Sequence, residues 1–245
     1  MVKKKPGEKK SKAAEDAEFN AQLKQLTVKS ERDTPPQEEP VVITTAEAKK
    51  NRKKRALDLT QAMEWYKRGL SLGVGETVQI GSQHYTKQQC NLQAVTLDPK
   101  HAHAWTNLGV SLSVGETTQI GNQHYTKQQC YAHALTLNPE VARTWYNLGN
   151  SLGVDGTTQI GNQHYTRQQC YVQALTLDPK HGDAWNNLGV SLDVGETVQI
   201  GSQHYTKHQC YEQALKLDPK DVHAWSNIGV SLGVGGQHSV GVNIS

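Results

Sequence analysis

The chain has 245 residues, of which 36% are hydrophobic, and it carries 26 Lys and Arg residues against 23 Asp and Glu residues. No apolar run approaches the roughly 18 residues that a membrane span requires, and the charged stretch MVKKKPGEKK lacks the apolar core of a secretory signal. We therefore expect a protein without a membrane span, in a reducing, cytoplasmic compartment.

The N-terminal region is basic, whereas the rest of the chain is slightly acidic. Residues 1–55 hold 15 Lys and Arg against 9 Asp and Glu, a net charge of +6, so the remaining residues have a net charge of −3. We predict a disordered basic tail over 1–55, because few of its residues can be buried, and a helix over 45–72. The stretch KKNRKKR at 49–55 is either a nuclear-import or acidic-partner segment or a solvated helix face. The charge of the remainder argues against a nucleic-acid surface there.

From residue 56 onward, three residue types recur with a period of forty. Such a period is typical of repeat proteins, in which each unit buries its apolar face only by stacking on its neighbours. We predict four repeats and a half repeat over 56–235, followed by a disordered tail over 236–245. The recurring residues are Trp65, Trp105, Trp145, Trp185 and Trp225; Gly69, Gly109, Gly149, Gly189 and Gly229; and Pro99, Pro139, Pro179 and Pro219.

Each repeat contains two segments with helical spacing. In the first segment, Trp145, Leu148 and Leu152 fall on one helical face. The second segment runs over 127–137 and is expected to end at Asn138, because a residue that precedes proline disfavours the α conformation.

Between these helices lies a polar segment, for example TTQIGNQHYT at 117–126. A Gly-Asn or Gly-Ser pair between β-prone runs favours a two-residue type II′ turn. Pairing outward from the turn sets Ile120 opposite Gln123, and Thr118 opposite Tyr125. We therefore predict a β-hairpin finger in each repeat, with an irregular loop as the alternative.

The residues after the finger predict an immediate start of the second helix. Thr126 and Gln129 form a T-x-x-Q capping box, and Tyr125 and Cys130 have the spacing of a hydrophobic staple. Because an isolated hairpin is marginal in water, we expect each finger to lean on another finger or on the helices.

The repeat resembles the tetratricopeptide repeat (TPR), although its period is longer than the family's period of about 34 residues. The resemblance implies an all-α helical-repeat solenoid, here with a short β-hairpin inserted between the two helices of each repeat. The first repeat departs from the pattern, with Arg68 and Asn91 at two landmark positions. The landmarks W-x2-L-G, aromatic, Ala and Pro are matched in the second repeat by Trp105, Leu108, Gly109, Tyr131, Ala134 and Pro139.

One departure from the TPR pattern affects packing. The small residue that TPRs place early in the second helix is replaced by a basic residue. We therefore expect the recurring cysteine to face the glycine of the first helix instead. The basic residues are Lys87, Lys127, Arg167 and Lys207.

The cysteines are expected to be buried core residues. Equivalent positions in stacked repeats lie about 10 Å apart, beyond the reach of a disulfide, and one His and one Cys per repeat do not complete a metal site. We find no catalytic constellation and no phosphate-binding Lys-Ser/Thr motif, and predict a chain that is not an enzyme and uses no cofactor, metal or small-molecule substrate. The cysteines are Cys90, Cys130, Cys170 and Cys210.

An asparagine recurs immediately before the Leu-Gly or Ile-Gly of four first helices. A side-chain amide both donates and accepts hydrogen bonds, so a row of them can bind the backbone of an extended peptide. The row is similar to the asparagine ladder in the TPR arm of O-GlcNAc transferases; the alternative is that asparagine is simply common at this TPR position. The candidate peptide-binding residues are Asn107, Asn147, Asn187 and Asn227.

Together these features predict a protein–protein interaction scaffold that binds a peptide or partner protein in the concave groove of a TPR superhelix. The alternatives are the substrate-binding arm of a glycosyltransferase that lacks its catalytic domain, and a nucleic-acid-associated protein that acts through its basic tail. The fifth unit has only a first helix, about 224–232, in which Trp225, Ile228 and Leu232 can pack backward onto the fourth unit. Because terminal repeats usually end in a polar helix, we expect weak self-association through this end.

Overall fold

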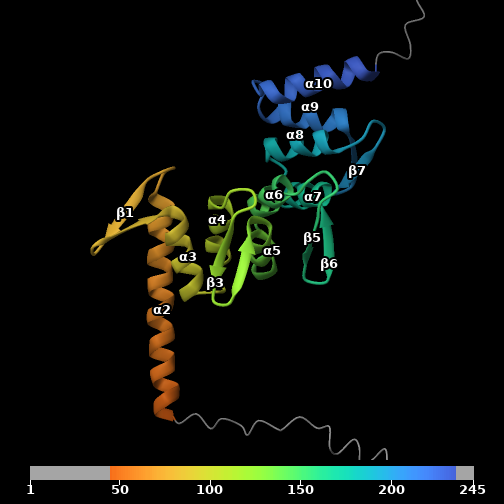
Figure 1. Cartoon of the computed structure of the whole chain (residues 1–245). Helices are drawn as coiled ribbons and strands as arrows, with labels where there is room; N and C mark the ends of the chain where they lie inside the picture. The colour runs from red at the N-terminus through yellow and green to blue at the C-terminus, as the bar shows by residue number, and fades with distance from the viewer. Residues whose placement is uncertain (1–44, 236–245) are drawn as a thin grey trace, which may run out of the picture. The chain divides into compact units, whose positions relative to one another are not determined.

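The computed structural model describes residues 45–235, with side chains through Ser231 (Figure 1). The tails predicted over 1–44 and 236–245 lie outside the described residues. The helices are α2 (Thr45–Ser71), α3 (Lys87–Leu97), α4 (Ala102–Ser111), α5 (Lys127–Leu137), α6 (Ala142–Ser151), α7 (Arg167–Leu177), α8 (Gly182–Ser191), α9 (Lys207–Leu217) and α10 (Val222–Gly235). The strands are β1 (Thr77–Ile80), β2 (Gln83–Thr86), β3 (Thr117–Ile120), β4 (Gln123–Thr126), β5 (Thr157–Ile160), β6 (Gln163–Thr166), β7 (Thr197–Ile200) and β8 (Gln203–Thr206).

The repeat is a first helix, a two-stranded hairpin and a second helix, which makes the chain an all-α, TPR-like helical-repeat solenoid with inserted β-hairpins. In the second to fourth repeats the second helix contacts the first helix of its own repeat and that of the next, and α3 contacts α4. This is the nearest-neighbour packing by which repeat proteins bury their apolar faces. Within residues 45–235, no helix is both long and apolar enough to cross a membrane.

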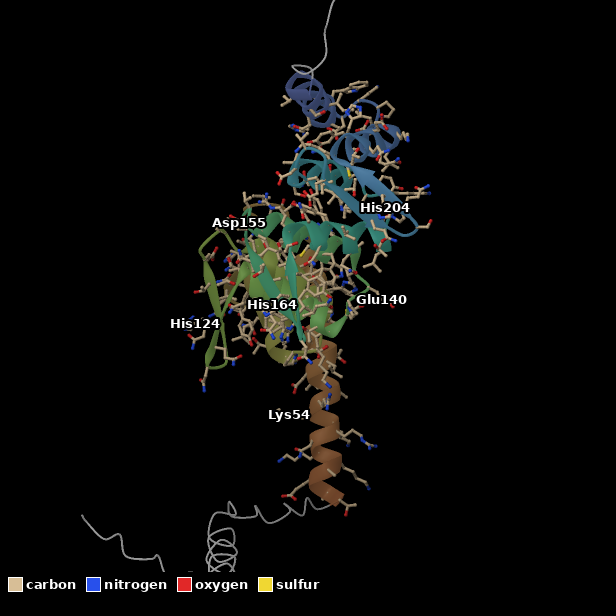
Figure 2. The ribbon with its side chains drawn as sticks, turned by 90° about the vertical axis from the view of Figure 1, so that its right-hand side faces the viewer. Lys54, His124, Glu140, Asp155, His164 and His204 are labelled. Atoms are coloured by element: carbon tan, nitrogen blue, oxygen red, sulfur yellow. The ribbon has the colours of Figure 1, made fainter. Side chains whose placement is uncertain are left out.

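Helix α2 begins well before the first repeat. The helix predicted over 45–72 is present, so the disordered tail predicted to end at residue 55 is wrong for residues 45–55, which are helical. Ala, Lys and Arg favour a helix there. The basic residues at 49–55 are all exposed, and Figure 2 shows Lys54 pointing away from the helix.

Each hairpin has the predicted register. We call β1–β2, β3–β4, β5–β6 and β7–β8 the first to fourth fingers. In the second finger, Ile120 pairs with Gln123 and Thr118 with Tyr125. Gly121 has φ of 59°, and no described residue other than glycine has positive φ, as a type II′ turn requires. The irregular-loop alternative is therefore wrong.

The second helix begins immediately after each finger. The main-chain N–H of Gln129 donates to Thr126 Oγ1 at 3.3 Å, and the main-chain N–H of Thr126 donates to Gln129 Oε1 at 2.8 Å. This reciprocal pair is the predicted capping box, and it recurs in all four second helices. It satisfies main-chain donors that have no partner within the helix.

In the first, third and fourth repeats, the basic residue at the start of the second helix donates hydrogen bonds to the carbonyl of the leucine that ends the first helix. Lys87 Nζ donates to the carbonyl of Leu72 at 3.1 Å, and Lys207 Nζ donates to that of Leu192 at 2.6 Å. Arg167 donates to the corresponding Leu152 carbonyl from two nitrogens, at 3.0 and 2.7 Å. The side chain thus satisfies a carbonyl that the helix leaves without a partner.

In the second, third and fourth repeats the glycine of the first helix faces a tyrosine, so the prediction that a cysteine faces it is wrong for these repeats. A Cβ atom added to Gly109 would lie 2.6 Å from Cε1 of Tyr131, and the same contact recurs at Gly149 and Gly189. The cysteines are fully buried elsewhere in the core. The first repeat has Asn91 in place of the tyrosine, and there a cysteine, Cys90, also lies close to the glycine, with its Cβ 3.3 Å from the added Cβ position.

Each finger is anchored to a helix by one aromatic pair. The ring of Tyr125 lies 4.9 Å from that of Trp105, and the other three fingers repeat the contact at 4.7 or 4.8 Å. The tyrosine hydroxyl donates to a glutamine in its own strand, as from Tyr125 to Gln123 Oε1 at 2.6 Å. The fingers therefore lean on the first helices, one of the two arrangements expected.

The last helix leaves its tryptophan uncovered. Trp105, Trp145 and Trp185 are at most 4% exposed, whereas Trp225 on α10 is 56% exposed. Helix α10 packs backward onto α9, as expected, but more than half of the Trp225 side chain stays exposed, because the described chain has no fifth finger whose tyrosine would cover it. Ile228 is half-buried, and the side chain of Leu232 lies outside the described ones.

Candidate peptide-binding surface

The predicted asparagine row lies on successive first helices, but its members differ in what they contact. Asn107, Asn147, Asn187 and Asn227 are all half-buried. Asn187 Nδ2 donates to Asn150 Oδ1 at 2.9 Å, and Asn227 Nδ2 donates to Asn186 Oδ1 at 2.9 Å. Two members of the row therefore link consecutive repeats.

Asn147 lacks the equivalent bond. Its Nδ2 atom is buried and has no hydrogen-bond partner among the described residues. Asn150, the acceptor for Asn187, comes 37 residues before it in the chain. The residue that comes 37 residues before Asn147 is Val110, whose side chain has no acceptor. The hydroxyl of Thr106, at the position of Asn186, instead bonds the Ala102 carbonyl and Thr144.

Asn150 is the centre of a polar cluster in the third repeat. Its Oδ1 accepts from the hydroxyl of Tyr171 at 2.8 Å and from Asn187 Nδ2 at 2.9 Å. These two bonds fix the orientation of the amide, and its Nδ2 has no partner in the described part of the chain. Asn150 is exposed, so both N–H groups are available to a ligand.

This cluster lines a small pocket of about 250 Å³, which we call the Asn150 pocket. Burial raises the pKa of Tyr171 to about 12, so its hydroxyl remains protonated. Arg167 uses Nε and Nη2 on the Leu152 carbonyl, and its guanidinium adds a positive charge to the wall. The pocket is formed by Asn150, Arg167, Tyr171, Asn187 and Val190.

The second and fourth repeats present valine where the third repeat presents Asn150, and the first repeat presents Leu70. Val110 and Val190 are 41% and 49% exposed. The surface of the first helices thus has one oriented amide between apolar side chains. Sequence analysis missed this site, although a signal was present, because Asn150 is the one polar residue at a repeat position that otherwise holds Leu or Val, and Arg167 is the one arginine at a position that otherwise holds Lys.

The cysteines have little chemical reactivity in the folded state. Burial raises the pKa values of Cys130, Cys170 and Cys210 to about 12, so little of the nucleophilic thiolate is present. Among the described residues, no group of three or more His, Cys, Asp or Glu side chains has the proximity needed to hold a metal ion.

The sequence matches no protein-family profile and no curated protein. Among solved structures, the chain is similar to one described as the crystal structure of MamA protein, with 15% sequence identity and a TM-score of 0.45. The match covers 75% of this chain and 84% of that one.

Proposed function

We propose that this chain is a non-enzymatic interaction scaffold that binds an extended peptide across the first helices of its repeats, with the Asn150 pocket holding the peptide backbone. The observation that carries the proposal is the exposed Asn150 amide, which two hydrogen bonds to its oxygen hold in one orientation. A preoriented donor loses less entropy on binding than a free side chain.

The surroundings of Asn150 suit a peptide. Its two free N–H groups can donate to a main-chain carbonyl, which requires no particular peptide sequence. Val110 and Val190 offer apolar contacts for side chains on either side of that carbonyl. The Arg167 guanidinium favours a peptide with a carboxylate at this point.

The proposal is tested with peptides selected on the full chain from a random 12-residue phage-displayed library. Asn150→Val gives the third repeat the residue of its neighbours, and we expect selected peptides to bind it about tenfold more weakly, the effect of one lost hydrogen bond. His204→Ala alters an exposed residue on the fourth finger (Figure 2) and serves as the control. Equal affinity of the Asn150→Val variant and the unmodified chain for every selected peptide would refute the proposal.

A further inference from the structure

A second cavity, unrelated to the Asn150 pocket, lies between the second and third fingers. It has a volume of about 660 Å³, within the range of about 300–1,000 Å³ typical of ligand sites. We call it the inter-finger slot. Its walls are three consecutive residues of β4 and three of β5, and its floor is α5; the lining residues are Gln123, His124, Tyr125, Gln129, Ala132, His133, Thr136, Thr157, Thr158 and Gln159.

Both walls of the slot belong to strands that have an unpaired edge. Each described sheet has only two strands, so β4 and β5 each have one free edge. Residues that flank a two-residue turn form a hydrogen-bonded pair, and the pattern alternates from there. His124, opposite Gln119, and Gln159, opposite His164, therefore direct their main-chain N–H and C=O groups away from their own partner strands.

The residue at the floor of this space differs between repeats. The residues equivalent to Ala132 are Leu92 in the first repeat and Val172 in the third. Leu92 and Val172 both pack against the core, as does Val198, the equivalent of Thr158, and Thr118 is only 7% exposed. Ala132, the smallest of the three side chains, lines the slot.

We propose that the inter-finger slot binds an extended, uncharged peptide strand by β-augmentation. Main-chain groups at free edges give affinity to such a strand, and the pockets between them select its side chains. No Asp, Glu, Lys or Arg side chain lines the slot, so a charged side chain would lose its hydration there without an ion-pair partner. The small Ala132 provides room for one side chain of the incoming strand.

The test uses the full chain and the same kind of random phage-displayed library, now selected in competition with the Ala132→Leu variant. Leu92 occupies the equivalent position in the first repeat, so the larger side chain is compatible with the fold, and circular dichroism verifies this. We expect peptides bound by the unmodified chain to bind Ala132→Leu at least tenfold more weakly. Val172→Leu makes the same kind of change at the equivalent position of the next repeat, outside the slot, so it is the matched control and should change affinity less than twofold.

Hydrogen exchange of the complex provides a second measurement. Exchange of the His124 and Gln159 amides should slow when a peptide binds, because those N–H groups become hydrogen-bonded. Failure to select a peptide sensitive to Ala132→Leu, or unchanged exchange at both amides, would overturn the proposal. The outcome is independent of Asn150→Val, which alters a different surface.

Discussion

At the residue scale, the packing of each repeat depends on one close approach. The rings of Tyr131, Tyr171 and Tyr211 lie where a side chain on the facing glycine would be. Glycine is usually unfavourable inside a helix, so its presence there is explained by the tyrosine ring and not by backbone conformation. The exposed Gly229 has no atom of another element within 4 Å of the added Cβ position.

Gly109→Ala should therefore destabilise the fold. Its Cβ would lie 2.6 Å from the Tyr131 ring, and overpacking of this kind costs about 1–3 kcal/mol. Gly229→Ala is the matched control, since the same change in an open helical position should stabilise by about 0.5–1 kcal/mol. Urea unfolding of both variants measures the difference, and an equal effect of the two changes would contradict the packing argument.

The unpartnered amide of Asn147 leads to a second prediction. Val110→Asn places an acceptor where Asn150 stands relative to Asn187, and an unsatisfied buried donor costs about 1–3 kcal/mol. We expect a higher melting temperature. Val190→Asn is the control, because Asn227 already donates to Asn186. If Val190→Asn raised the melting temperature as much as Val110→Asn, the prediction would be contradicted.

At the scale of the elements, side-chain caps mark the starts of the second helices and of α4 and α8, whereas α6 begins at Val141 without one. Second helices use Thr and Gln, whereas α4 and α8 use a histidine. The main-chain N–H of Ala104 donates to His101 Nδ1 at 3.2 Å, and the His101 ring packs on Tyr66 at 4.6 Å. An imidazole caps a helix in this way only when its Nδ1 is unprotonated.

The His101 cap should make stability dependent on pH. Burial lowers the pKa of His101 below 6.5, the nearby Asp98 carboxylate opposes this effect, and His103 adds to it. The unfolded chain thus binds a proton more readily, so the contribution of His101 is complete above about pH 6.5 and declines as the pH falls below it. His101→Asn keeps a good cap without titrating. We expect the loss of melting temperature between pH 7.5 and 5 to be smaller in this variant, and an identical loss would contradict the prediction.

The elements were predictable from sequence to the extent that their signals are local. The Gly-Asn turn, the Thr126–Gln129 box and Asn138 before proline lie next to the boundaries that they set. The Tyr131–Gly109 contact and the Asn150 cluster join side chains from different helices. Which side chains meet there depends on how the helices pack, and the repeat pattern alone does not specify this.

At the scale of the whole molecule, the last described helix, α10, exposes apolar side chains, among them a tryptophan whose equivalents are buried in the earlier repeats. Val222, Trp225 and Val230 on α10 are all more than half exposed. Each equivalent tryptophan contacts the tyrosine of its own finger, and the described chain contains no finger after α10. Apolar side chains grouped on one helix favour association with another surface.

We predict weak, concentration-dependent self-association through α10, measured by sedimentation equilibrium of the full chain. Trp225→Lys should reduce it, because a charge would be buried in the contact. Val114→Lys replaces an isolated exposed valine outside α10 and should have no effect. Association that is insensitive to Trp225→Lys would place the contact elsewhere, and a monomer at all concentrations would refute the prediction.

Each of the four repeats holds one buried cysteine, so the rate at which that cysteine is modified measures how often its repeat opens. Every second helix holds one thiol with no solvent exposure, and burial raises the pKa of each. An alkylating reagent can therefore modify a thiol only while its repeat is transiently open. We expect mass spectrometry to find Cys90 and Cys210 labelled sooner than Cys130 and Cys170, which have complete repeats on both sides. Equal labelling rates would instead mean that the array opens as one cooperative unit.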